Sequence, residues 1–343
     1  MKPFFSILIP AYNVESYIIK CLDSIIEQTF LDWECIVIND GSTDKTEQIC
    51  HRYAKMDKRI KIFHQENAGV AVTRNRLIDK SSGKYFIFVD GDDWWNEKDM
   101  LKNVNEYIQK YNLDIVAWRA FFYNTKTHKR KAATEWIPKD IHVTQTGEEY
   151  IQCLLEKSKK FLWWLFLYAI SKDLWIECNV SFTPNRLVCE DQEILYKVIL
   201  SAKRIQIINK EFYSYRILRE TSAMTVPSLK GALDMLEVAE NNIKAIETMD
   251  ISYQLKKLLT ANMAHAFMWM GYWLPKLKTK EEQKILYKRL CQTKWMINLE
   301  EKTIKNVFEQ IPVRILGIKM GFGLLQIEEK AKLLLKKIIS HKN

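Results

Sequence analysis

Three aspartates follow one apolar stretch of this sequence within four positions. The segment FIFVDGDDWW places Asp90, Asp92 and Asp93 directly after the apolar residues 86–89. Like charges so close together raise each other's pKa and destabilise a fold unless a cation or donor groups compensate for them. Carboxylate oxygens are preferred ligands of Mg²⁺ and Mn²⁺, and Mg²⁺ usually keeps open positions for substrate phosphates. The spacing therefore predicts a divalent-cation site that holds a diphosphate; the alternative is a solvated acidic turn before the next helix.

The elements that must position these aspartates alternate regularly along the first 90 residues. Apolar runs predict strands at 4–10, 33–40, 60–64 and 84–90, and helical periodicity predicts helices at 14–29, 42–55 and 69–83. Asp44 and Glu47 have the spacing of a capping box for the second helix. A strand and a helix in turn, repeating about every 25 residues, indicate a mainly parallel sheet with helices on both faces.

Polar segments stand at the carboxyl end of each predicted strand. They are PAYN (10–13), NDGS (39–42), QEN (65–67) and DGDD (90–93). In open sheets of this type, ligands bind outside the carboxyl ends of the strands. We therefore expect the four segments to meet at one rim and form a binding site.

Charge is distributed unevenly along the chain. The net charge is +10, yet residues 1–100 hold 13 Lys and Arg against 16 Asp and Glu, whereas residues 301–343 hold 9 against 4. The basic excess lies away from the acidic rim, which argues against nucleic acid as the partner. Residues 322–343 place apolar side chains on one helical stripe and lysines largely off it. Such a basic amphipathic helix suits an anionic membrane surface, and it suits equally a helix packed on the rest of the protein.

The sequence also predicts where the protein works. The longest strongly apolar run, residues 161–170, is half of the roughly 20 residues that a membrane-spanning helix needs. The N-terminus lacks the long apolar region and cleavage site of a signal peptide. Seven cysteines without a C-x-x-C pair are typical of reduced thiols. We expect a cytoplasmic protein, with peripheral attachment at the inner face of the membrane through its basic tail.

Common nucleotide and hydrolase motifs are absent from the sequence. PAYNVES after the first strand is not G-x-G-x-x-G, so it does not indicate a dinucleotide site, and no P-loop sequence occurs. Neither G-x-S-x-G nor H-E-x-x-H is present. These absences leave metal-assisted diphosphate chemistry as the prediction for the rim.

Five segments in order resemble family 2 glycosyltransferases of the GT-A fold. They are SILIPAYNVESYIIKCLDSIIEQTF, ECIVINDGSTDKT, NAGVAVTRN, YFIFVDGDDWW and CEDQEI, spread over residues 4 to about 195, with a weaker likeness to about 225. The resemblance implies an α/β GT-A domain at residues 1–225 and a helical C-terminal region at 226–343. It also implies transfer of a sugar from a nucleoside-diphosphate sugar, with inversion, in the manner of bacterial surface-polysaccharide enzymes.

The resemblance assigns donor-binding roles to particular residues of this chain. Asp90 is expected near the ribose or donor sugar, Asp92 on the metal, and Asp93 in either place. The cofactor is expected to be Mn²⁺ or Mg²⁺. The remaining donor-binding residues implied are Pro10, Ala11, Tyr12, Glu15, Asp40, Gly69, Arg74 and Asn75, with the Tyr12 ring near the base and Asp40 accepting a hydrogen bond from it. Asn39 departs from the family, which usually has aspartate there.

Two further segments receive roles from the same resemblance. Asp191, in the acidic pair with Glu190, is the expected general base that takes the proton from the acceptor hydroxyl. The alternative for this pair is an exposed helix start whose acids favour the helix dipole. Arg216 and Arg219 are expected on a loop that closes over the diphosphate. For aromatic residues such as Trp164, stacking on a sugar or lipid is the alternative to core packing, which we favour.

Together these inferences predict a metal-dependent inverting glycosyltransferase. Its donor is expected to be a nucleoside-diphosphate sugar, most simply a UDP-sugar, and its acceptor a hydroxyl of a growing, lipid-linked glycan. Two other classes stay open: a nucleotidyltransferase, and a non-catalytic protein that binds sugar nucleotides. The sequence does not name the sugar, the linkage, the metal or the oligomeric state.

Overall fold

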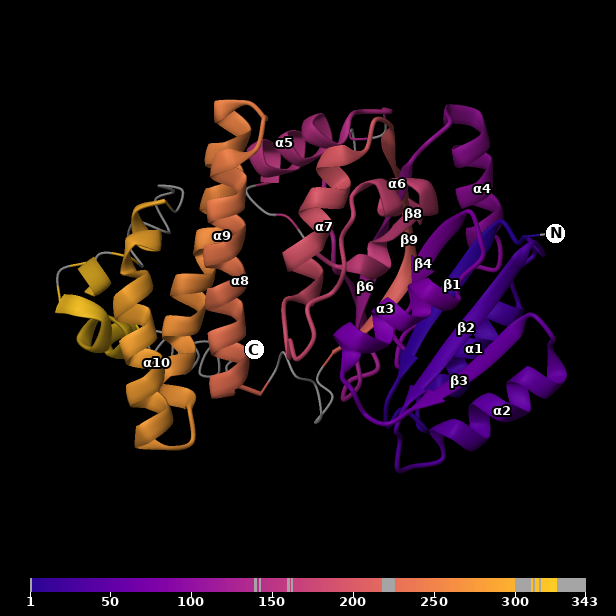
Figure 1. Cartoon of the computed structure of the whole chain (residues 1–343), viewed down its shortest axis with the longest axis horizontal. Helices are drawn as coiled ribbons and strands as arrows, with labels where there is room; N and C mark the ends of the chain where they lie inside the picture. The colour runs from indigo at the N-terminus through magenta and orange to yellow at the C-terminus, as the bar shows by residue number, and fades with distance from the viewer. Residues whose placement is uncertain are drawn as a thin grey trace, which may run out of the picture. The chain divides into compact units, whose positions relative to one another are not determined.

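In a computed structural model of the chain, the residues described are 2–138, 141, 143–158, 161, 163–217, 226–299, 310, 312–314 and 316–325. The chain divides into two compact units, Met1–Ser222 and Ala223–Asn343. Figure 1 labels the elements of both units.

One twisted sheet forms the centre of the first unit (Figure 1). In the described part of the chain its strands are β1 (Phe5–Ala11), β2 (Trp33–Asp40), β3 (Ile60–Gln65), β4 (Tyr85–Phe88), β5 (Trp94–Trp95), β6 (Ile115–Asn124), β7 (Arg130–Ala132), β8 (Tyr168–Ser171) and β9 (Ile205–Ile217). Their spatial order is β3-β2-β1-β4-β8-β6-β9-β5, and β7 pairs with β6. The first four strands are parallel, as predicted. β8 runs antiparallel to β4 and β6, β6 is parallel to β9, and β5 and β7 are antiparallel to their neighbours.

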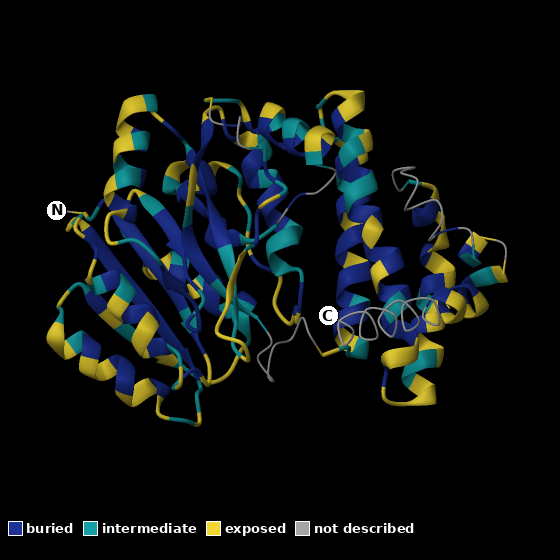
Figure 2. Ribbon diagram, turned by 180° about the vertical axis from the view of Figure 1, so that it is seen from behind, coloured by how far each residue is buried: buried dark blue, intermediate teal, exposed yellow. Residues whose placement is uncertain are grey.

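Helices cover both faces of this sheet. They are α1 (Ile18–Ile26), α2 (Thr46–Met56), α3 (Val70–Lys80), α4 (Met100–Tyr111), α5 (Gly147–Ser158), α6 (Lys172–Glu177) and α7 (Glu190–Ser201), with a short 3₁₀ turn η1 at Leu165–Leu167. α1 and α2 contact each other, whereas α3 packs on β1 and β2. Right-handed crossovers place α1 and α2 on one face and α3 on the other, because the chain reverses direction after β3. Figure 2 shows buried strands between helices whose outer sides are exposed.

The chain reversal creates a topological switch point at the carboxyl ends of the strands. β1 lies between β2 and β4, so the connection that follows β1 and the one that leads into β4 diverge on opposite faces. Ligands of open α/β sheets bind at such a switch point. Two of the predicted polar segments, PAYN and DGDD, therefore leave the sheet beside each other.

The predicted capping box of α2 is wrong. α2 begins at Thr46, and no side chain caps it. Asp44 instead accepts hydrogen bonds from the Thr46 and Glu15 backbone N–H groups, at 2.9 and 3.0 Å. Glu15 in turn accepts one from the Lys45 N–H at 2.8 Å. Both acids are thus used to join the loops after β1 and β2, which fixes the shape of the rim.

The second unit is helical in its described residues. It contains α8 (Leu229–Thr248), α9 (Tyr253–Trp273), α10 (Lys280–Thr293) and the 3₁₀ turns η2 (Leu274–Lys276) and η3 (Lys294–Asn298). α8 packs along α9, and Ser228, Ser252 and Thr279 cap the three long helices. Across the described residues of both units, no helix has the length and apolarity to span a bilayer. Most of the predicted basic amphipathic helix, residues 326–343, lies outside the described residues.

A buried carboxylate near the start of β2 contacts residues of β1 and β3 and the segment ahead of β4. Glu34 of β2 accepts hydrogen bonds from Ser6 of β1, from the Ser82 N–H and hydroxyl ahead of β4, and from Lys61 of β3 at 2.7 Å. Burial alone would raise the pKa of Glu34, but these donors outweigh it and lower the pKa to about 2. The ionised carboxylate therefore stabilises the sheet that carries the rim.

We predict that Glu34→Gln lowers the free energy of unfolding at pH 7 by roughly 1–3 kcal/mol, because a buried charged acceptor is lost. Since the folded-state pKa lies below the unfolded value, this contribution is complete above about pH 4.5 and disappears as the pH falls through about 2. Urea unfolding at several pH values measures it. Glu106→Gln, an exposed change on α4, is the control. An equal loss of stability at all pH values would contradict the ionic origin.

Candidate active site

The three aspartates after β4 form a tight turn at the carboxyl end of the sheet. The Asp93 N–H donates to the Asp90 carbonyl at 2.9 Å. Asp92 and Asp93 are buried, and Asp90 is half-buried. A side chain at Gly91 would lie 3.3 Å from the Pro10 carbonyl, so glycine allows the turn to approach the loop after β1. The predicted meeting of these two segments is present.

Residues of β9 hold this turn in place through hydrogen bonds. The Asp93 carboxylate accepts hydrogen bonds from the Tyr213 hydroxyl at 2.9 Å and from the Arg216 N–H at 2.7 Å. The Tyr213 hydroxyl accepts one from the Asp90 N–H, and the Arg216 Nε donates to the Asp92 carbonyl. Burial, with the charges of Asp92 and Asp90, raises the pKa of Asp93 well above its usual range. Sequence analysis missed Tyr213, although it stands in the same YSYR segment as Arg216.

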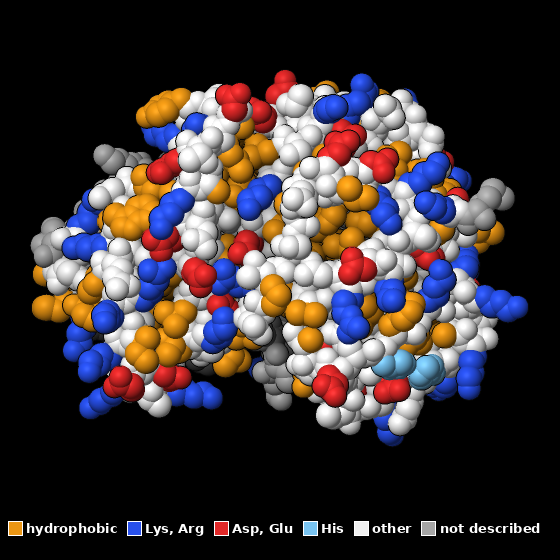
Figure 3. All heavy atoms as spheres, viewed as in Figure 1, with side chains coloured by type: hydrophobic (Ala, Val, Ile, Leu, Met, Phe, Trp, Pro, Cys, Tyr) orange, Lys and Arg blue, Asp and Glu red, His pale blue; other side chains and the backbone are white. Residues whose placement is uncertain are grey.

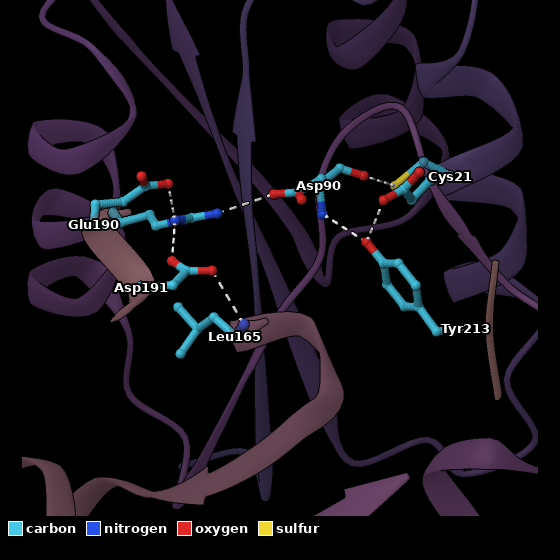
Figure 4. A network of polar contacts seen from close by, with 8 residues as sticks. Cys21, Asp90, Leu165, Glu190, Asp191 and Tyr213 are labelled. Carbon is cyan, nitrogen blue, oxygen red and sulfur yellow. Dashed lines mark hydrogen bonds and ion pairs between the residues drawn. The ribbon is translucent and has the colours of Figure 1, made fainter. Parts of the chain in front are cut away.

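One buried arginine gathers the acids of the predicted site. Arg74 of α3 contacts Glu190 at 2.7 Å and Asp191 at 2.5 Å through one guanidinium nitrogen, and Asp90 at 3.2 Å through another. Figure 4 shows these carboxylates converging on the guanidinium from α7 and from the turn after β4. The Arg74 side chain is only 5% exposed. Residues separated by 116 positions in the sequence are thereby brought into one cluster, the Arg74 cluster.

The environment of Asp191 makes it a weak acid. Burial raises its pKa, the Arg74 guanidinium opposes this, and the charges of Glu190 and Asp90 raise it further, to about 7. The Leu165 N–H of η1 donates to its second oxygen at 3.1 Å and fixes the orientation of the carboxylate. A fixed carboxylate with a pKa near neutrality has the properties of a general base at physiological pH.

Arg74 was predicted beside a diphosphate, and in this structure its guanidinium contacts acids. The charges of Asp191, Glu190 and Asp90 outweigh burial and raise the pKa of Arg74 above its ordinary value. Its Nε–H is buried without a hydrogen-bond partner among the described residues. The arginine is therefore the counter-ion of the acidic cluster, and its role toward a ligand stays a prediction.

The predicted nucleotide end lies at β1, β2 and the start of α3. The Asp40 carboxylate accepts hydrogen bonds from the backbone N–H groups of Ala68 and Gly69 and from Gln65, at 2.8, 2.9 and 2.6 Å. These bonds hold the loop that begins α3, where Gly69 has φ +84°, a conformation that favours glycine. A direct contact of Asp40 with a base is a prediction that the structure leaves open.

The other predicted donor residues are placed around the same rim. Tyr12 is 50% exposed, and Pro10 and Ala11 precede it at the end of β1. Asn75 exchanges two hydrogen bonds with the Phe182 backbone, at 2.8 and 2.9 Å, and so holds the segment before α7. Arg219 lies outside the described residues. Sequence analysis placed Gln65 at the rim without predicting its hydrogen bond to Asp40. It missed Phe182, because a pairing with the backbone has no local signature in the sequence.

The acidic turn has the chemistry of a site for a hard divalent cation. Three carboxylates stand within four residues, and Arg74 pairs with one of them, Asp90. Burial raises the pKa of Asp93, and the charges of Asp92 and Asp90 raise it further; a cation would offset this part that comes from like charge. The predicted ligands Asp92 and Asp93 therefore fit Mg²⁺ or Mn²⁺ in donor type.

A second group of potential metal ligands lies elsewhere in the first unit. Glu47 and His51 of α2 meet His64 of β3, with ligand atoms all within 4.8 Å of one another. All three side chains are exposed, and Figure 3 shows neighbouring histidines on this face of the molecule. Asn39, the departure from the family pattern, lies 3.4 Å from both Glu47 and His64.

The aromatic residues before α7 pack against one another. Trp164 stacks on Tyr215 with ring centroids 5.5 Å apart, and Phe166 stacks on Tyr213 at 4.2 Å. This agrees with the packing alternative that the sequence favoured.

Sequence comparisons place the chain among glycosyltransferases. Residues 6–168 match the family described as Glycosyl transferase family 2. The chain is 31% identical over 237 residues to the uncharacterized glycosyltransferase EpsJ of Bacillus subtilis. The matched region covers 68% of this chain and 66% of EpsJ. It is 28% identical over 225 residues to the poly(ribitol-phosphate) beta-N-acetylglucosaminyltransferase TarS of Staphylococcus aureus, covering 64% of this chain and 37% of TarS.

Solved structures share the fold over most of the chain. The crystal structure of S. aureus TarS 1–349 in complex with UDP-GlcNAc superposes with a TM-score of 0.71 at 21% identity, covering 96% of this chain and 92% of that one. The mannosyltransferase PcManGT of Pyrobaculum calidifontis, in complex with GDP-Man and Mn²⁺, superposes with a TM-score of 0.55 at 15% identity, covering 95% and 83%. The predicted α/β GT-A fold with a helical C-terminal region is confirmed. By its ordered motifs, its fold and these relatives, the chain belongs to glycosyl transferase family 2.

Proposed function

We propose that this protein transfers a sugar from a nucleoside-diphosphate sugar to a hydroxyl group of a growing glycan. The observation that carries the proposal is the Arg74 cluster, which fixes a carboxylate with a pKa near 7 at the switch point of the sheet. The acidic turn stands beside it, joined through Asp90. A general base beside a diphosphate site suits a displacement at the anomeric carbon, because the base activates the acceptor while the diphosphate leaves.

In the proposed chemical step, Asp191 is the general base. The acceptor oxygen attacks the anomeric carbon while Asp191 takes the hydroxyl proton, and the bond to the diphosphate oxygen breaks on the opposite side. The nucleoside diphosphate leaves with the bonding electron pair, so the anomeric centre inverts and no covalent intermediate forms. Asp92 and Asp93 are the residues that would hold Mn²⁺ or Mg²⁺, which supplies charge stabilisation to the leaving diphosphate when bound.

The donor and acceptor classes are proposed from the relatives. TarS 1–349 binds UDP-GlcNAc and PcManGT binds GDP-Man with Mn²⁺, so a nucleotide-bound sugar and a divalent metal are the expected donor and cofactor here. We favour UDP because the higher structural similarity is to TarS. TarS is named for a poly(ribitol-phosphate) acceptor, which supports a surface-polymer acceptor for this chain.

Roles for the two parts of the chain are likewise proposals. We assign catalysis to residues 1–225 and acceptor or membrane engagement to residues 226–343, whose helices form a separate compact unit. A lipid-linked acceptor would bring the protein to the cytoplasmic face of the membrane.

We predict that Asp191→Asn reduces sugar transfer by about 100-fold to 10,000-fold, the usual range for removal of a general base. UDP binding should stay within about twofold, because asparagine keeps the shape of the side chain and an oxygen that accepts from Arg74. Radiolabelled sugar transfer and calorimetric UDP titration measure the two effects. Asp79→Asn, an exposed change on α3, is the matched control. Normal transfer by Asp191→Asn would refute the base assignment.

We predict that kcat/KM of the native protein falls tenfold per pH unit below about pH 7, where Asp191 becomes protonated. Arg74→Gln removes the cation that lowers the Asp191 pKa. The fall of kcat/KM on the acid side of the pH profile (the acid limb) should therefore move to higher pH. Arg74→Lys keeps the charge and should restore the limb toward its native position. Rate profiles between pH 5 and 9 provide the measurement. An acid limb near pH 4, or a downward shift in Arg74→Gln, would contradict the assignment.

Thermal unfolding with nucleotides tests the donor class and the metal. A ligand present at 100 times its Kd stabilises the folded state by about 2.7 kcal/mol, which corresponds to a shift of several degrees. We expect UDP to give this shift in the presence of Mn²⁺, with GDP and CDP giving less. Asp92→Asn should abolish the part that needs metal. If no nucleoside diphosphate raises the unfolding temperature, the donor site is wrong.

A further inference from the structure

Three cationic side chains surround one indole ring at the edge of the proposed active site. The Lys20 Nζ of α1 lies 3.6 Å from the Trp94 ring centroid. The guanidinium carbons of Arg216 and Arg130 lie 4.7 and 5.8 Å from the same ring. Because all three distances share one ring, the three positive charges are close together. We call Lys20, Arg130 and Arg216 the basic cluster.

Among the described residues, the basic cluster lacks an acidic partner for an ion pair. In the described part of the chain, no carboxylate forms an ion pair with any of its three members. Burial lowers the pKa of Lys20, and the neighbouring charges of Arg216 and Arg130 lower it further. Three cations held near one another without a carboxylate repel each other, and an anion between them would remove this cost.

Aromatic rings hold the cations in place. Trp94 of β5 is buried, and Tyr123 of β6 packs edge-on against it with ring centroids 5.0 Å apart. The Arg216 guanidinium also lies 4.7 Å from the Tyr17 ring. Cation–π attraction of this kind orients each cation and leaves its N–H groups available as hydrogen-bond donors. The basic cluster therefore presents N–H donors that are held in position by packing on aromatic rings.

The basic cluster adjoins the acidic turn without overlapping the Arg74 cluster. The Arg216 Nε donates to the Asp92 carbonyl at 2.7 Å, so this cation touches the backbone of the proposed metal ligand. Asp90 contacts Arg74 at 3.2 Å and donates its N–H to the Tyr213 hydroxyl, and Figure 4 shows Tyr213 on the side of Asp90 away from Glu190 and Asp191. Arg216 follows Tyr213 on β9. An anion on the basic cluster would thus lie next to the place where the diphosphate is expected.

We propose that Lys20, Arg130 and Arg216 bind a phosphate group of a substrate. A phosphate carries one to two negative charges and oxygens in several directions, which suits three donors that come from α1, β7 and β9. The phosphate belongs either to the diphosphate of the donor or to an acceptor that carries phosphate. The inference rests on the proposed function, since it deepens the substrate class of the same site.

Two substitutions test the cluster without changing Arg216, which is already assigned to donor binding. Lys20→Gln and Arg130→Gln each remove one exposed cation. Lys131→Gln is the matched control, because it removes the same charge from the next residue of β7, whose side chain points to the opposite face of the strand. Titrations of the native protein and the variants use pyrophosphate, UDP with Mn²⁺, a glycerol phosphate trimer, and uridine as the neutral probe.

We expect each cluster substitution to raise the Kd of a phosphate-bearing probe by about tenfold, the loss typical of one hydrogen bond to a charged group. Uridine binding and the Lys131→Gln protein should not change. A loss for pyrophosphate and UDP identifies the donor as the source, and a loss for the glycerol phosphate trimer alone identifies the acceptor. Either result supports the site.

Unchanged affinity for all three phosphate probes in both variants would overturn the proposal, and so would an equal loss in Lys131→Gln. These outcomes are separate from failure of the proposed function. If the native protein binds neither UDP nor uridine, the transferase proposal fails, while pyrophosphate and the trimer still decide whether the basic cluster binds phosphate.

Discussion

The site depends on a single buried cation. Arg74 joins a helix on one face of the sheet to the turn after β4 and to the first turn of α7, and each junction is an ion pair with a carboxylate. A guanidinium that is 5% exposed needs such partners, because an unpaired charge in the interior is strongly destabilising. The need to neutralise Arg74 therefore fixes where the acids of the site can lie.

Carboxylates in this small region have different properties because their surroundings differ. Asp90 pairs with Arg74 and stays partly open to solvent, whereas Asp93 is enclosed and accepts hydrogen bonds from β9. Asp191 lies between these cases, with one oxygen on Arg74 and the other on a backbone N–H. Environment alone thus separates residues of one chemical type into a counter-ion of Arg74, a carboxylate held by β9 and the proposed base.

The sequence predicted local features well and long-range partners poorly. The strand at 33–40 was placed at its observed bounds, since its apolar run and the following glycine are local signals. The DGDD turn was also located, because three carboxylates directly after an apolar run are a local signal in the sequence. The Arg74 pairing was missed because its partners lie 16 to 117 positions away. The basic cluster was missed for the same reason, since α1, β5, β7 and β9 are adjacent only after the sheet has formed.

The anchoring of the acidic turn on β9 has a consequence for biosynthesis. Asp93 receives its hydrogen bonds from residues 120 and 123 positions further along the chain. At translation rates of about 5–20 residues per second, these donors are made roughly 6 to 25 seconds after the aspartates. During that interval the first four strands can pair, but the turn must keep its carboxylates hydrated. The four parallel strands that begin the domain are thus made before β9, the strand that fixes the geometry of the acidic turn.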